Sequence, residues 1–482
     1  MLEKVHQDRL KKLAKIRQLG IDPYGGRYDT AEPVAEILAR FREGDDSQRA
    51  DAAGRIILMR PMGKLVFAHI RDESGAMQIC LRRDGLDQTA WSLAKLLDLG
   101  DIVAAEGRLA KTRTGEITIF AEKLTLLCKS VLPMPEKFHG LVDVETRYRQ
   151  RYLDLMSNPE AMALAYKRIA LIGHFRALLR QRGFVEVETP MLQPIYGGAA
   201  ARPFTTHHNA LDVDLYLRIS PELYLKRLLV GGMEKVFEFN RVFRNEGIDS
   251  SHSPEYTLLE LYQAYADYEV MLELTEELIS TAAEAVGGGT KLPFGELEID
   301  YARPWRRAKY EELLHEHAGV SMRDPAGVRE KARRLGIEEA NKADAVVIDQ
   351  LFKQTVEQHL IQPTFVMDYP AELCPLTRRK PDDPAVALRF EPYVAGMELG
   401  NAYTELNDPA VQEANFGFQL AGEAEGESMR VMDEDFITAL RQGMPPAGGL
   451  GIGIDRVVML LTNRTSIRDV ILFPTLRPQA AE

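Results

Sequence analysis

Two arginines stand in separate stretches whose residue types suit the binding of a nucleotide's phosphates. Arg244 belongs to Phe-Arg-Asn-Glu, which His252 and Tyr256 follow, and Arg456 ends the run Gly-Leu-Gly-Ile-Gly-Ile-Asp-Arg. An arginine stays charged and presents a planar fork of donors. Two of them converging on one phosphate would therefore stabilise the extra charge of a phosphoryl-transfer transition state. The pair predicts an ATP site.

The run before Arg456 alternates glycine with aliphatic residues, at Gly449, Gly451 and Gly453. In a strand this pattern leaves one bare face, and three glycines would weaken a strand that served structure only. A bare face would let a flat ring such as adenine lie against the backbone. A dinucleotide-binding fingerprint is the alternative. It needs a third glycine at Ile454 or Arg456, and the chain that remains is too short for the rest of that fold.

The stretch around Arg244 is expected to form a β-hairpin. Residues 236–244 and 257–264 both alternate around a polar loop rich in Asn, Gly, Asp, Ser and Pro. The polar face of this hairpin would carry Glu238, Asn240, Arg244, Glu260 and Tyr262. Because unpaired buried charge is costly, a sheet face of this composition indicates a ligand site.

Short alternating segments fill the chain from residue 53 to about residue 132. They begin at Gly54, Leu65, Ala76, Asp101 and Glu116. About five strands broken by turns are typical of a small Greek-key barrel of the oligonucleotide-binding type. Phe67 and Gln78 stand on neighbouring strands, where an aromatic ring could stack on an unpaired base and an amide could bond its edge. Taken alone, a Phe and a Gln on strands are more often a core and a surface position than a nucleic-acid site.

Three stretches, in this order along the chain, resemble the signature motifs of the class II aminoacyl-tRNA synthetases, and within that class the lysyl-tRNA synthetases. Residues 183–190, Gly-Phe-Val-Glu-Val-Glu-Thr-Pro, resemble motif 1, the Arg244 hairpin resembles motif 2, and residues 449–456 resemble motif 3. The resemblance covers nearly the whole chain. It implies an α+β protein: a catalytic domain built on an antiparallel sheet with helices, preceded by a five-stranded OB-fold barrel.

The resemblance assigns roles around ATP. Arg244 and Arg456 would grip the α- and γ-phosphates from either side. His252 would reach the terminal phosphate, and Tyr256 would stack on adenine, where the family usually has Phe. At Ser251 the family normally has an arginine, so one phosphate contact is expected to be weaker here. The implied ATP-binding residues are Arg244, Glu246, His252, Tyr256, Glu391, Glu398, Gly451, Gly453 and Arg456.

The amino-acid pocket decides the substrate within the class. Period two places Asn401, Tyr403 and Glu405 on one face of a strand. Glu405 and Glu260 would offer two carboxylates, and Tyr262 a hydroxyl, to a ligand that is cationic at one end, as lysine is. An aspartate-activating relative would need a basic residue in place of Glu405, and an asparagine-activating one a site without net negative charge.

The resemblance completes the lysine pocket. Gly198 and Glu222 would bind the α-amino end of lysine, and Arg244 with Asn401 would bind its carboxylate. Residues 220–226, Ser-Pro-Glu-Leu-Tyr-Leu-Lys, match the family almost letter for letter.

Magnesium is expected, because the phosphates of ATP need neutralising and hard cations prefer carboxylate oxygens. By resemblance, Glu391 and Glu398 would hold the ion. Seven residues separate them, so in an unbroken strand they would face opposite sides. We therefore expect a bulge at Gly396 or Gly400 that turns one of them inward. Two ordinary surface glutamates are the alternative.

The resemblance implies ATP-dependent ligation of L-lysine to tRNA(Lys) in two steps. The lysine carboxylate attacks the α-phosphorus to give lysyl-adenylate and pyrophosphate, and the terminal ribose hydroxyl of tRNA then attacks the adenylate carbonyl. Catalysis would rest on positioning and charge neutralisation, without a side-chain nucleophile. Cys80, Cys128 and Cys374 lack metal-site spacing and are expected to be reduced thiols.

Other contacts with tRNA are expected in the N-terminal part. By resemblance, Phe67, Gln78 and Glu116 would read the central uridine of the anticodon. Residues 1–19 suit an amphipathic helix with Lys4, Lys11 and Lys15 in one stripe, which would contact tRNA phosphates or simply be a solvated face. The net charge of −12 argues against a general nucleic-acid binder, so such contacts would be local patches.

The expected domains are an N-terminal helical extension (1–52), an OB-fold anticodon-binding domain (53–132), a linker (133–157) and a class II catalytic domain (158–482). Residues from about 283 to 360 read as a helical, polar insertion. By resemblance, motif 1, with a helix through Arg180 and a strand to Thr189, would form the interface of a homodimer. No apolar run approaches a membrane span, and the chain is expected to be a cytoplasmic enzyme.

Two rival functions remain. One is a paralogue that charges a protein lysine instead of tRNA, but such relatives resemble the catalytic domain alone, and the predicted barrel counts against this alternative. The other is a non-catalytic nucleic-acid-binding module derived from an inactive synthetase. Loss of Arg244, Arg456 or the magnesium carboxylates would support it, and all of these residues are present.

Overall fold

The computed structural model describes residues 2–134, 141, 143–340, 342–420 and 432–479. The chain forms two compact units that divide between Val142 and Asp143. Two short helices, α4 (Val144–Arg149) and α5 (Arg151–Ser157), open the second unit. Much of the segment that the sequence predicts as a linker is therefore helical and belongs to that unit.

The first unit is a closed five-stranded barrel, as predicted, with the strand order β1-β2-β3-β5-β4. Its strands are β1 (Arg49–Met62), β2 (Leu65–Arg71), β3 (Ala76–Arg82), β4 (Ile102–Lys111) and β5 (Ile117–Cys128). Helices α2 (Val34–Arg40) and α3 (Gln88–Ala94) belong to the same unit and contribute apolar residues to its core. The alternating aliphatic residues of the strands point inward, so that Ile56, Ile70, Ile79 and Ile119 are fully buried. The backbones of two strands approach each other closely at Gly107, where a Cβ would stand 2.1 Å from the carbonyl oxygen of Phe120. This position therefore requires glycine.

The N-terminal helix α1 (Leu2–Gln18) belongs to the first unit and confirms the predicted helix. Leu13 and Ile16 are buried. Arg9 is also buried, and its guanidinium donates to the carbonyl oxygens of Leu132 at 2.7 Å and Leu99 at 3.0 Å. The predicted basic stripe of Lys4, Lys11 and Lys15 is exposed.

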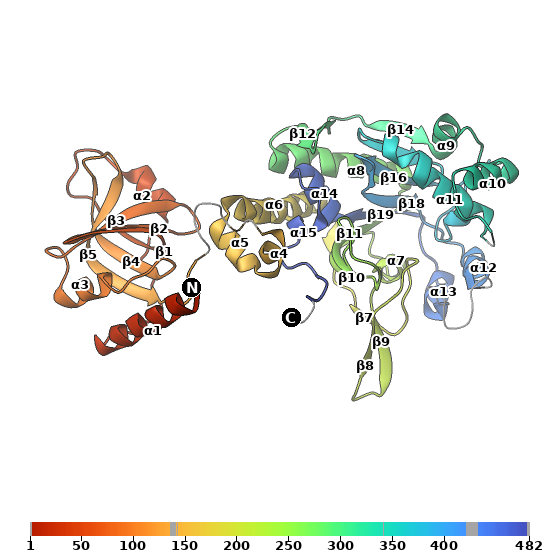
Figure 1. Cartoon of the computed structure of the whole chain (residues 1–482). Coiled ribbons are helices and arrows are strands. Elements are labelled where there is room, and N and C mark those ends of the chain that lie inside the picture. Colours follow the sequence, from red (N-terminus) through yellow and green to blue (C-terminus); the bar gives the residue numbers. More distant parts are fainter. Residues whose placement is uncertain (1, 135–140, 142, 341, 421–431, 480–482) are drawn as a thin grey trace. The chain divides into compact units, whose positions relative to one another are not determined.

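The second unit is built on one large, mainly antiparallel sheet with the order β14-β15-β16-β18-β19-β11-β10-β6, in which β17 pairs with β16 (Figure 1). Only the pairs β10–β6 and β14–β15 are parallel. The strands are β6 (Val185–Glu186), β10 (Lys235–Phe243), β11 (Glu255–Ala264), β14 (Arg306–Lys309), β15 (Thr364–Met367), β16 (Arg389–Val394), β17 (Met397–Glu398), β18 (Gly400–Thr404) and β19 (Ala447–Gly453). This sheet confirms the α+β class and the predicted hairpin, which is β10–β11.

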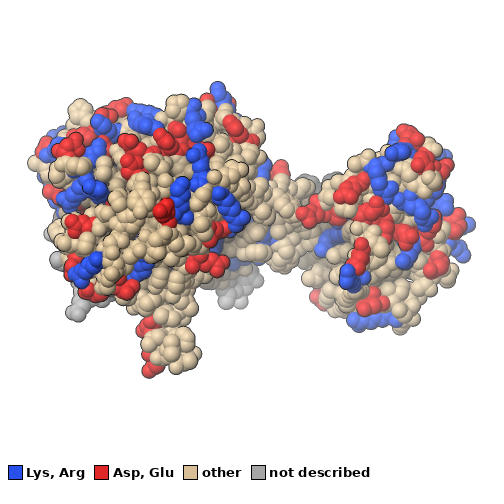
Figure 2. Space-filling view, turned by 180° about the vertical axis from the view of Figure 1, so that it is seen from behind, with Lys and Arg blue, Asp and Glu red and all other residues tan. Residues whose placement is uncertain are grey.

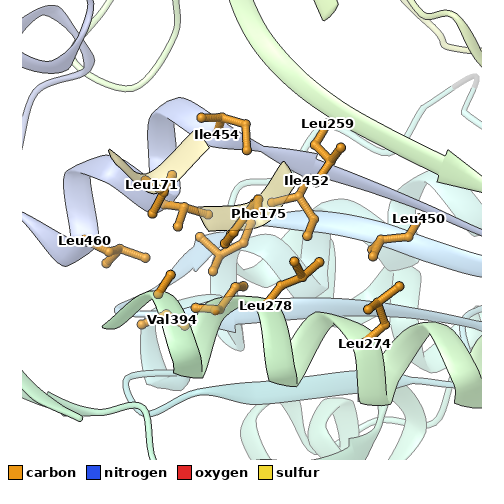
Figure 3. Close-up of a cluster of buried hydrophobic side chains, with 14 of the residues drawn as sticks. Leu171, Phe175, Leu259, Leu274, Leu278, Val394, Leu450, Ile452, Ile454 and Leu460 are labelled. Carbon is orange, nitrogen blue, oxygen red and sulfur yellow. The ribbon is translucent and has the colours of Figure 1, made fainter. Parts of the chain in front are cut away.

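Three helices pack on one face of this sheet: α6 (Pro159–Gln181), α8 (Tyr268–Ala282) and α14 (Ile454–Leu461). Phe175 from α6 and Leu278 from α8 meet Leu450 and Ile452 of β19 in the main hydrophobic core (Figure 3). The aliphatic residues of the glycine-rich strand therefore face the hydrophobic core. Its glycines face the other side of the sheet, because successive side chains of a strand point to opposite faces.

The predicted insertion at 283–360 is only partly helical. It contains a hairpin of β12 (Lys291–Phe294) and β13 (Leu297–Asp300), and its strand β14 extends the main sheet. The helical elements are η1 (Ala283–Gly287), α9 (Tyr310–Ala318), α10 (Pro325–Arg334), α11 (Asp344–Thr355) and η2 (Glu357–His359). These helices also have an apolar core of their own, in which Tyr310 stacks on Phe352 at 4.0 Å between ring centroids. The segment therefore contains strands and an apolar core in addition to the helices that the sequence predicts.

The remaining elements are a small sheet and several short helical segments. A small sheet with the order β7-β9-β8 projects from the unit (Figure 1). Its strands are β7 (Leu192–Gln193), β8 (Thr205–His208) and β9 (Val213–Leu217). The helical segments not yet named are α7 (Glu222–Val230), η3 (Ala371–Leu373), α12 (Pro409–Leu420), α13 (Glu434–Arg441) and α15 (Ile467–Val470). Basic and acidic side chains are interspersed on the face of each unit that Figure 2 shows. Among the described residues, no helix combines the length and apolar character that crossing a membrane would require.

Candidate active site

A cavity of about 530 Å³ lies over the face of the large sheet opposite the main core. Its floor includes Gly449, Gly451 and Gly453 of β19, and Glu260 and Tyr262 of the neighbouring strand β11. The bare face predicted from the alternating glycines is therefore the floor of the cavity. Of the residues that the sequence predicts for ATP, lysine and magnesium, all except Glu391 and Glu405 line this one cavity.

Arg244 follows the last residue of β10 and is held at its backbone, where its N–H donates to the carbonyl of Pro254 at 2.8 Å. Its guanidinium lies 5.4 Å from the ring centroid of Tyr256. The Nε atom is buried and finds no hydrogen-bond acceptor among the described residues. Because an unpaired buried donor is costly, this cationic group is suited to an anionic ligand such as a phosphate or a carboxylate.

The loop between β10 and β11 is organised by Asp249. Its carboxylate accepts from the backbone N–H groups of Ser251 at 2.7 Å and His252 at 2.8 Å. These hydrogen bonds, of which the one from Ser251 has the largest effect, hold the pKa of Asp249 well below its usual range. Asp249 Oδ2 also lies 2.8 Å from His252 Nδ1. Ser251 thus serves to order the loop, and His252 is anchored by one ring nitrogen while its ring borders the cavity.

Arg456 stands in the first turn of α14, directly after the glycine-rich strand. The preceding residue, Asp455, is buried and fixes the start of this helix, because its Oδ2 accepts the backbone N–H of Thr257 at 2.8 Å and its Oδ1 pairs with Arg168. Arg456 donates to the carbonyl oxygen of Glu398, and 4.0 Å separates its Nη1 from Glu398 Oε2. The cavity therefore has an arginine on each of two separate elements.

Glu391 and Glu398 lie on one face of the sheet, but for a different reason from the one predicted. The chain reverses between β16 and β17 at Ala395 and Gly396, which have φ angles of 52° and 73°. This turn places Glu398 opposite Tyr393, two residues from Glu391, so all three side chains share a face. The turn at Gly396, and not a bulge, brings the two carboxylates to one face. The register against β16 does shift by one residue around Gly400, between the pairs Tyr393–Glu398 and Phe390–Ala402.

The two carboxylates differ in their surroundings. Burial and the negative charge of Glu391 raise the pKa of Glu398 to about 7. Glu391 accepts from the hydroxyl groups of Tyr369 at 2.6 Å and Tyr393 at 3.0 Å and pairs with Arg389. Among the described residues, no group of three or more His, Cys, Asp or Glu side chains could hold a metal by itself. The pair fits Mg²⁺ bound in the usual way, by one or two carboxylates together with substrate phosphates.

The floor of the cavity near β11 carries Glu260, which is almost fully buried. Its two oxygens accept from the hydroxyl of Ser220 at 2.9 Å and from Tyr262 at 3.2 Å. Burial, supported by the charge of Glu222, raises the pKa of Glu260 to about 8. A cationic ligand would relieve this electrostatic cost and favour the ionised form.

The strand β18 presents Asn401, Tyr403 and the following Glu405 at the positions that period two predicts. Asn401 is opposite Gly451, and Tyr403 is opposite Gly449. Glu405 is buried behind the cavity wall, and burial raises its pKa to about 8 although the charge of Lys226 lowers it. Its Oε2 lies 2.5 Å from Lys226 Nζ, and this ammonium is also 2.6 Å from Glu222 Oε1.

Gly198 is constrained by both its backbone and its surroundings. Its φ angle is 84°, and a Cβ there would stand 3.0 Å from Glu222 Cβ and from Ser220 Oγ. The loop that contains Gly198 is therefore held close to the start of α7, where Glu222 is the first residue.

Two residues of the predicted polar face lie outside the cavity lining. Glu238 is paired with Arg218 at 2.6 Å and accepts from Thr189 at 2.7 Å, so its buried charge is balanced within the sheet. Asn240 donates to the backbone of Glu238. Glu238 lies on the predicted face opposite Glu260, but Arg218 already balances its charge, which a strand pattern does not show.

Sequence reasoning also missed a central residue, Lys226. Its ammonium is fully buried between Glu222 and Glu405. The signal was present, since Glu222 and Lys226 are four residues apart and so lie on the same face of a helix.

In the first unit, the residues predicted to read the anticodon meet on the barrel. Phe67 and His69 are two residues apart on β2, and His69 is opposite Gln78 of β3. Gln78 donates to Glu116 Oε2 at 2.7 Å, while His69 Nε2 lies 2.5 Å from Glu116 Oε1. Thr118 donates to the Gln78 carbonyl at 2.8 Å, which fixes the amide with its N–H side toward Glu116. His69 was not predicted.

Comparisons with known proteins give a consistent result. Residues 143–477 match the family model described as tRNA synthetases class II (D, K and N), and residues 52–127 match the model of an OB-fold nucleic acid binding domain. A protein of Carboxydothermus hydrogenoformans named lysine–tRNA ligase is 51% identical over 98% of this chain and 97% of its own length. Proteins of the same name from Pelotomaculum thermopropionicum (51% identity, 99% of this chain and 96% of theirs) and Moorella thermoacetica (50%, 98% and 97%) are also similar.

Proposed function

The chain belongs to the class II tRNA synthetases (D, K and N), and we propose from this membership and from the cavity that it is a lysine–tRNA ligase. The enzyme joins L-lysine to tRNA(Lys) for protein synthesis, using ATP and forming AMP and pyrophosphate. The observation that carries lysine as the substrate is the set of buried carboxylates Glu222, Glu260 and Glu405, of which the first two line the cavity and the third lies beside Gly449 in its floor. Such a site favours a cationic side chain and disfavours aspartate.

In the first step the lysine carboxylate attacks the α-phosphorus of ATP and pyrophosphate leaves. We propose that Arg244, whose buried Nε is without a partner among the described residues, binds the carboxylate and the α-phosphate, together with Asn401. Arg456 and His252 bind the phosphates that leave. Fixed positive charge in a partly enclosed cavity stabilises the charge that develops in the transition state.

The same proposal covers adenine and the amino end of lysine. Adenine lies over the bare backbone of Gly451 and Gly453 and against Tyr256, with Glu246 at the edge of the site. Gly198 and Glu222 bind the α-ammonium group of lysine. Glu260, Tyr262, Tyr403 and Glu405 form the end of the pocket that receives its side chain.

We propose Glu391 and Glu398 as the protein ligands of magnesium. The raised pKa of Glu398 is what a nearby cation would reverse, and β16–β17 presents both carboxylates on one face. When bound with ATP, the ion would neutralise phosphate charge and orient the phosphates.

In the second step the terminal ribose hydroxyl of tRNA attacks the carbonyl carbon of the adenylate, and AMP leaves. We propose that the barrel, residues 53–132, selects the tRNA by its anticodon. Phe67 provides a stacking surface, and the connected side chains of Gln78 and Glu116 provide hydrogen-bond groups beside it. Catalysis belongs to the second unit, and we propose the cytoplasm, where translation takes place, as the compartment.

We also propose a homodimer formed through motif 1. Met162, Tyr166 and Ile169 are exposed at spacings of four and three along α6, which makes one apolar stripe. Val185, Met191 and Leu192, in and after motif 1, are also exposed. An apolar surface of this kind is expected to be covered by another protein, and a second copy of the chain is the partner that the resemblance implies.

One experiment tests the substrate and the first step together. Purified protein is assayed for exchange of pyrophosphate into ATP with lysine, aspartate and asparagine singly, in the absence of tRNA. Exchange with lysine alone is the expected result. Exchange with aspartate would contradict the role given to Glu260 and Glu405, and no exchange with any of the three would contradict the enzymatic function.

A further inference from the structure

The carboxylate of Glu405 has one occupied oxygen and one open oxygen. Oε2 forms an ion pair with the fully buried ammonium of Lys226 at 2.5 Å, and apart from this ion pair neither oxygen finds a hydrogen-bond partner among the described residues. Oε1 points to the place where Gly449 lacks a side chain, close to the ring of Tyr262. A buried carboxylate oxygen without a donor is costly, so a donor supplied by the ligand would be strongly favoured there.

The charges around this position are balanced only when lysine is bound. Glu222, Glu260 and Glu405 are three buried carboxylates, and Lys226 is one buried ammonium. The α- and ε-ammonium groups of lysine would bring the positive charges to three, while the substrate carboxylate would be matched by Arg244. A substrate without the side-chain charge would leave one carboxylate unbalanced in a buried site.

We propose that Lys226 is a positioning residue for substrate selection, which holds one oxygen of Glu405 and leaves the other as the acceptor for the ε-ammonium of lysine. This inference rests on the proposed function and adds a residue that acts through Glu405 without touching the substrate's reacting atoms. Lys226 also holds Glu222, so one protein ammonium fixes the carboxylates proposed for both ends of the substrate. The ring of Tyr403, whose centroid is 5.5 Å from Lys226 Nζ, covers the ammonium from β18.

The charge of Lys226 also decides whether Glu405 is ionised. Burial raises the pKa of Glu405, Lys226 lowers it, and the negative charges of Glu222 and Glu260 raise it again. These groups come from α7 and β11, and the hydroxyl groups of Tyr262 and Tyr403 face the same space. Without Lys226, Glu405 would hold its proton to still higher pH, so that a smaller fraction of it would be the anion that the ammonium of the substrate binds.

Substitution of Lys226 by Met or Gln removes the charge with a similar side-chain length. We expect the KM for lysine in pyrophosphate exchange to rise about tenfold or more near pH 7, since a change of one pKa unit is tenfold in the ionised fraction. Near pH 9 most of this loss is expected to be recovered, because Glu405 then ionises in the variant as well. The kcat at saturating lysine stays close to that of the wild type, and Lys226→Arg retains the wild-type pH profile.

Selectivity gives a second readout. A neutral analogue of equal length, 6-hydroxynorleucine, can donate one hydrogen bond to Glu405 in either protonation state but carries no charge to match the anion, so it gains less than lysine from ionised Glu405. We expect the preference for lysine over this analogue to fall by about tenfold in Lys226→Met near pH 7 and to return in Lys226→Arg. A purely structural role for Lys226 would change activity with both substrates equally.

The first unit provides a matched control. Lys129 is also fully buried, with its ammonium 2.7 Å from Asp98 Oδ2 and 2.9 Å from Asp101 Oδ1. Lys129→Met removes the same kind of buried charge from the barrel. We expect it to lower the melting temperature of the barrel without changing the pH profile of the KM for lysine.

Three outcomes would overturn the inference. One is a KM for lysine that is unchanged in both neutral variants near pH 7. Another is a KM that is raised equally at every pH, and the third is an unaltered preference over 6-hydroxynorleucine. Thermal melting and ATP binding identify a variant that fails to fold, and the Gln variant, which keeps a donor for Glu222, then decides. Failure of the proposed function is distinguishable, because it would appear as absent lysine-dependent exchange in the wild type.

Discussion

The backbone of Gly449 lies directly against the carboxylate of Glu405, so that a Cβ at residue 449 would stand 1.9 Å from Oε1. The same Cβ would be 2.6 Å from Tyr262 Cε1. The carboxylate cannot easily move aside, because Lys226 holds its other oxygen. The first glycine of the strand therefore leaves room for Glu405 and Tyr262, the end of the cavity that we propose for the amino acid, in addition to the bare adenine surface that the sequence predicts.

Gly449→Ala is expected to impair lysine recognition. Overpacking of a buried site costs about 1–3 kcal/mol, which corresponds to a rise of about five- to 150-fold in the KM for lysine. Gly451→Ala is the matched control, because a Cβ there would meet only Asn401 Oδ1 and Glu260 Cγ, both at 3.7 Å. Its effect is expected on the KM for ATP. Steady-state pyrophosphate exchange with each substrate varied in turn measures both, and equal effects of the two variants on lysine would contradict the division.

The lysine KM is expected to fall as pH rises from about 6 to about 8.5, by up to about tenfold per pH unit for each proton released. Glu260 and Glu405 both have a pKa of about 8 in the ligand-free protein, so they are mainly protonated at the acid end of this range. A cationic ligand binds the ionised form, and binding therefore releases protons. Calorimetry of lysine binding in buffers of different ionisation enthalpy measures this release directly. A lysine affinity independent of pH would contradict the raised pKa values.

Arg456→Ala is expected to lower the rate of adenylate formation by at least about 10³-fold, the usual size of a lost arginine contact in phosphoryl transfer. The fold should remain intact, because the start of α14 is fixed by Asp455 and its bonds to Thr257 and Arg168. Single-turnover formation of lysyl-adenylate gives the rate, and circular dichroism with thermal melting checks the fold. A folded variant with normal adenylate formation would refute the phosphate role.

Phe67→Ala is expected to weaken aminoacylation of tRNA while leaving lysine activation unchanged. Loss of one stacking surface costs about 1–3 kcal/mol, or about five- to 150-fold in the KM for tRNA. The aromatic ring is partly exposed on β2, so its removal should affect the barrel core little. Pyrophosphate exchange in the same variant is the internal control. Equal losses in exchange and aminoacylation would rule out the anticodon role.

The sequence predicts the site best where the geometry is local. Period two correctly places Glu260 beside Tyr262 and Tyr403 beside Glu405, because a strand's alternation depends only on its own residues. The pattern fails where a residue far away in the sequence determines whether a side chain is available to a ligand. The charge of Glu238 looked available, but Arg218, twenty residues earlier, neutralises it.

The spacing of Glu391 and Glu398 shows a second limit. Counting along one strand predicts that the two side chains point to opposite faces of the sheet, and we therefore expected a bulge that would bring them to the same face. The chain instead turns back at Gly396, and a residue on the returning strand takes its face from the residue that it pairs with. Lys226 was missed for a related reason: its helical spacing from Glu222 was visible, but its contact with Glu405 joins residues that are far apart in the sequence.

The strand β19 alone separates the hydrophobic core from the cavity. Leu450 and Ile452 pack in the core on one face of the strand, and Gly449 and Gly451 form part of the floor of the cavity on the other. A shift of the backbone that accommodates a change on the core side must also displace the floor of the cavity, which is the surface that we propose for the substrates, since glycine has no side chain to absorb the shift. Thermal stability and catalytic efficiency are thus coupled through a single strand. Adaptation of this enzyme to a new temperature would have to come mainly from other elements.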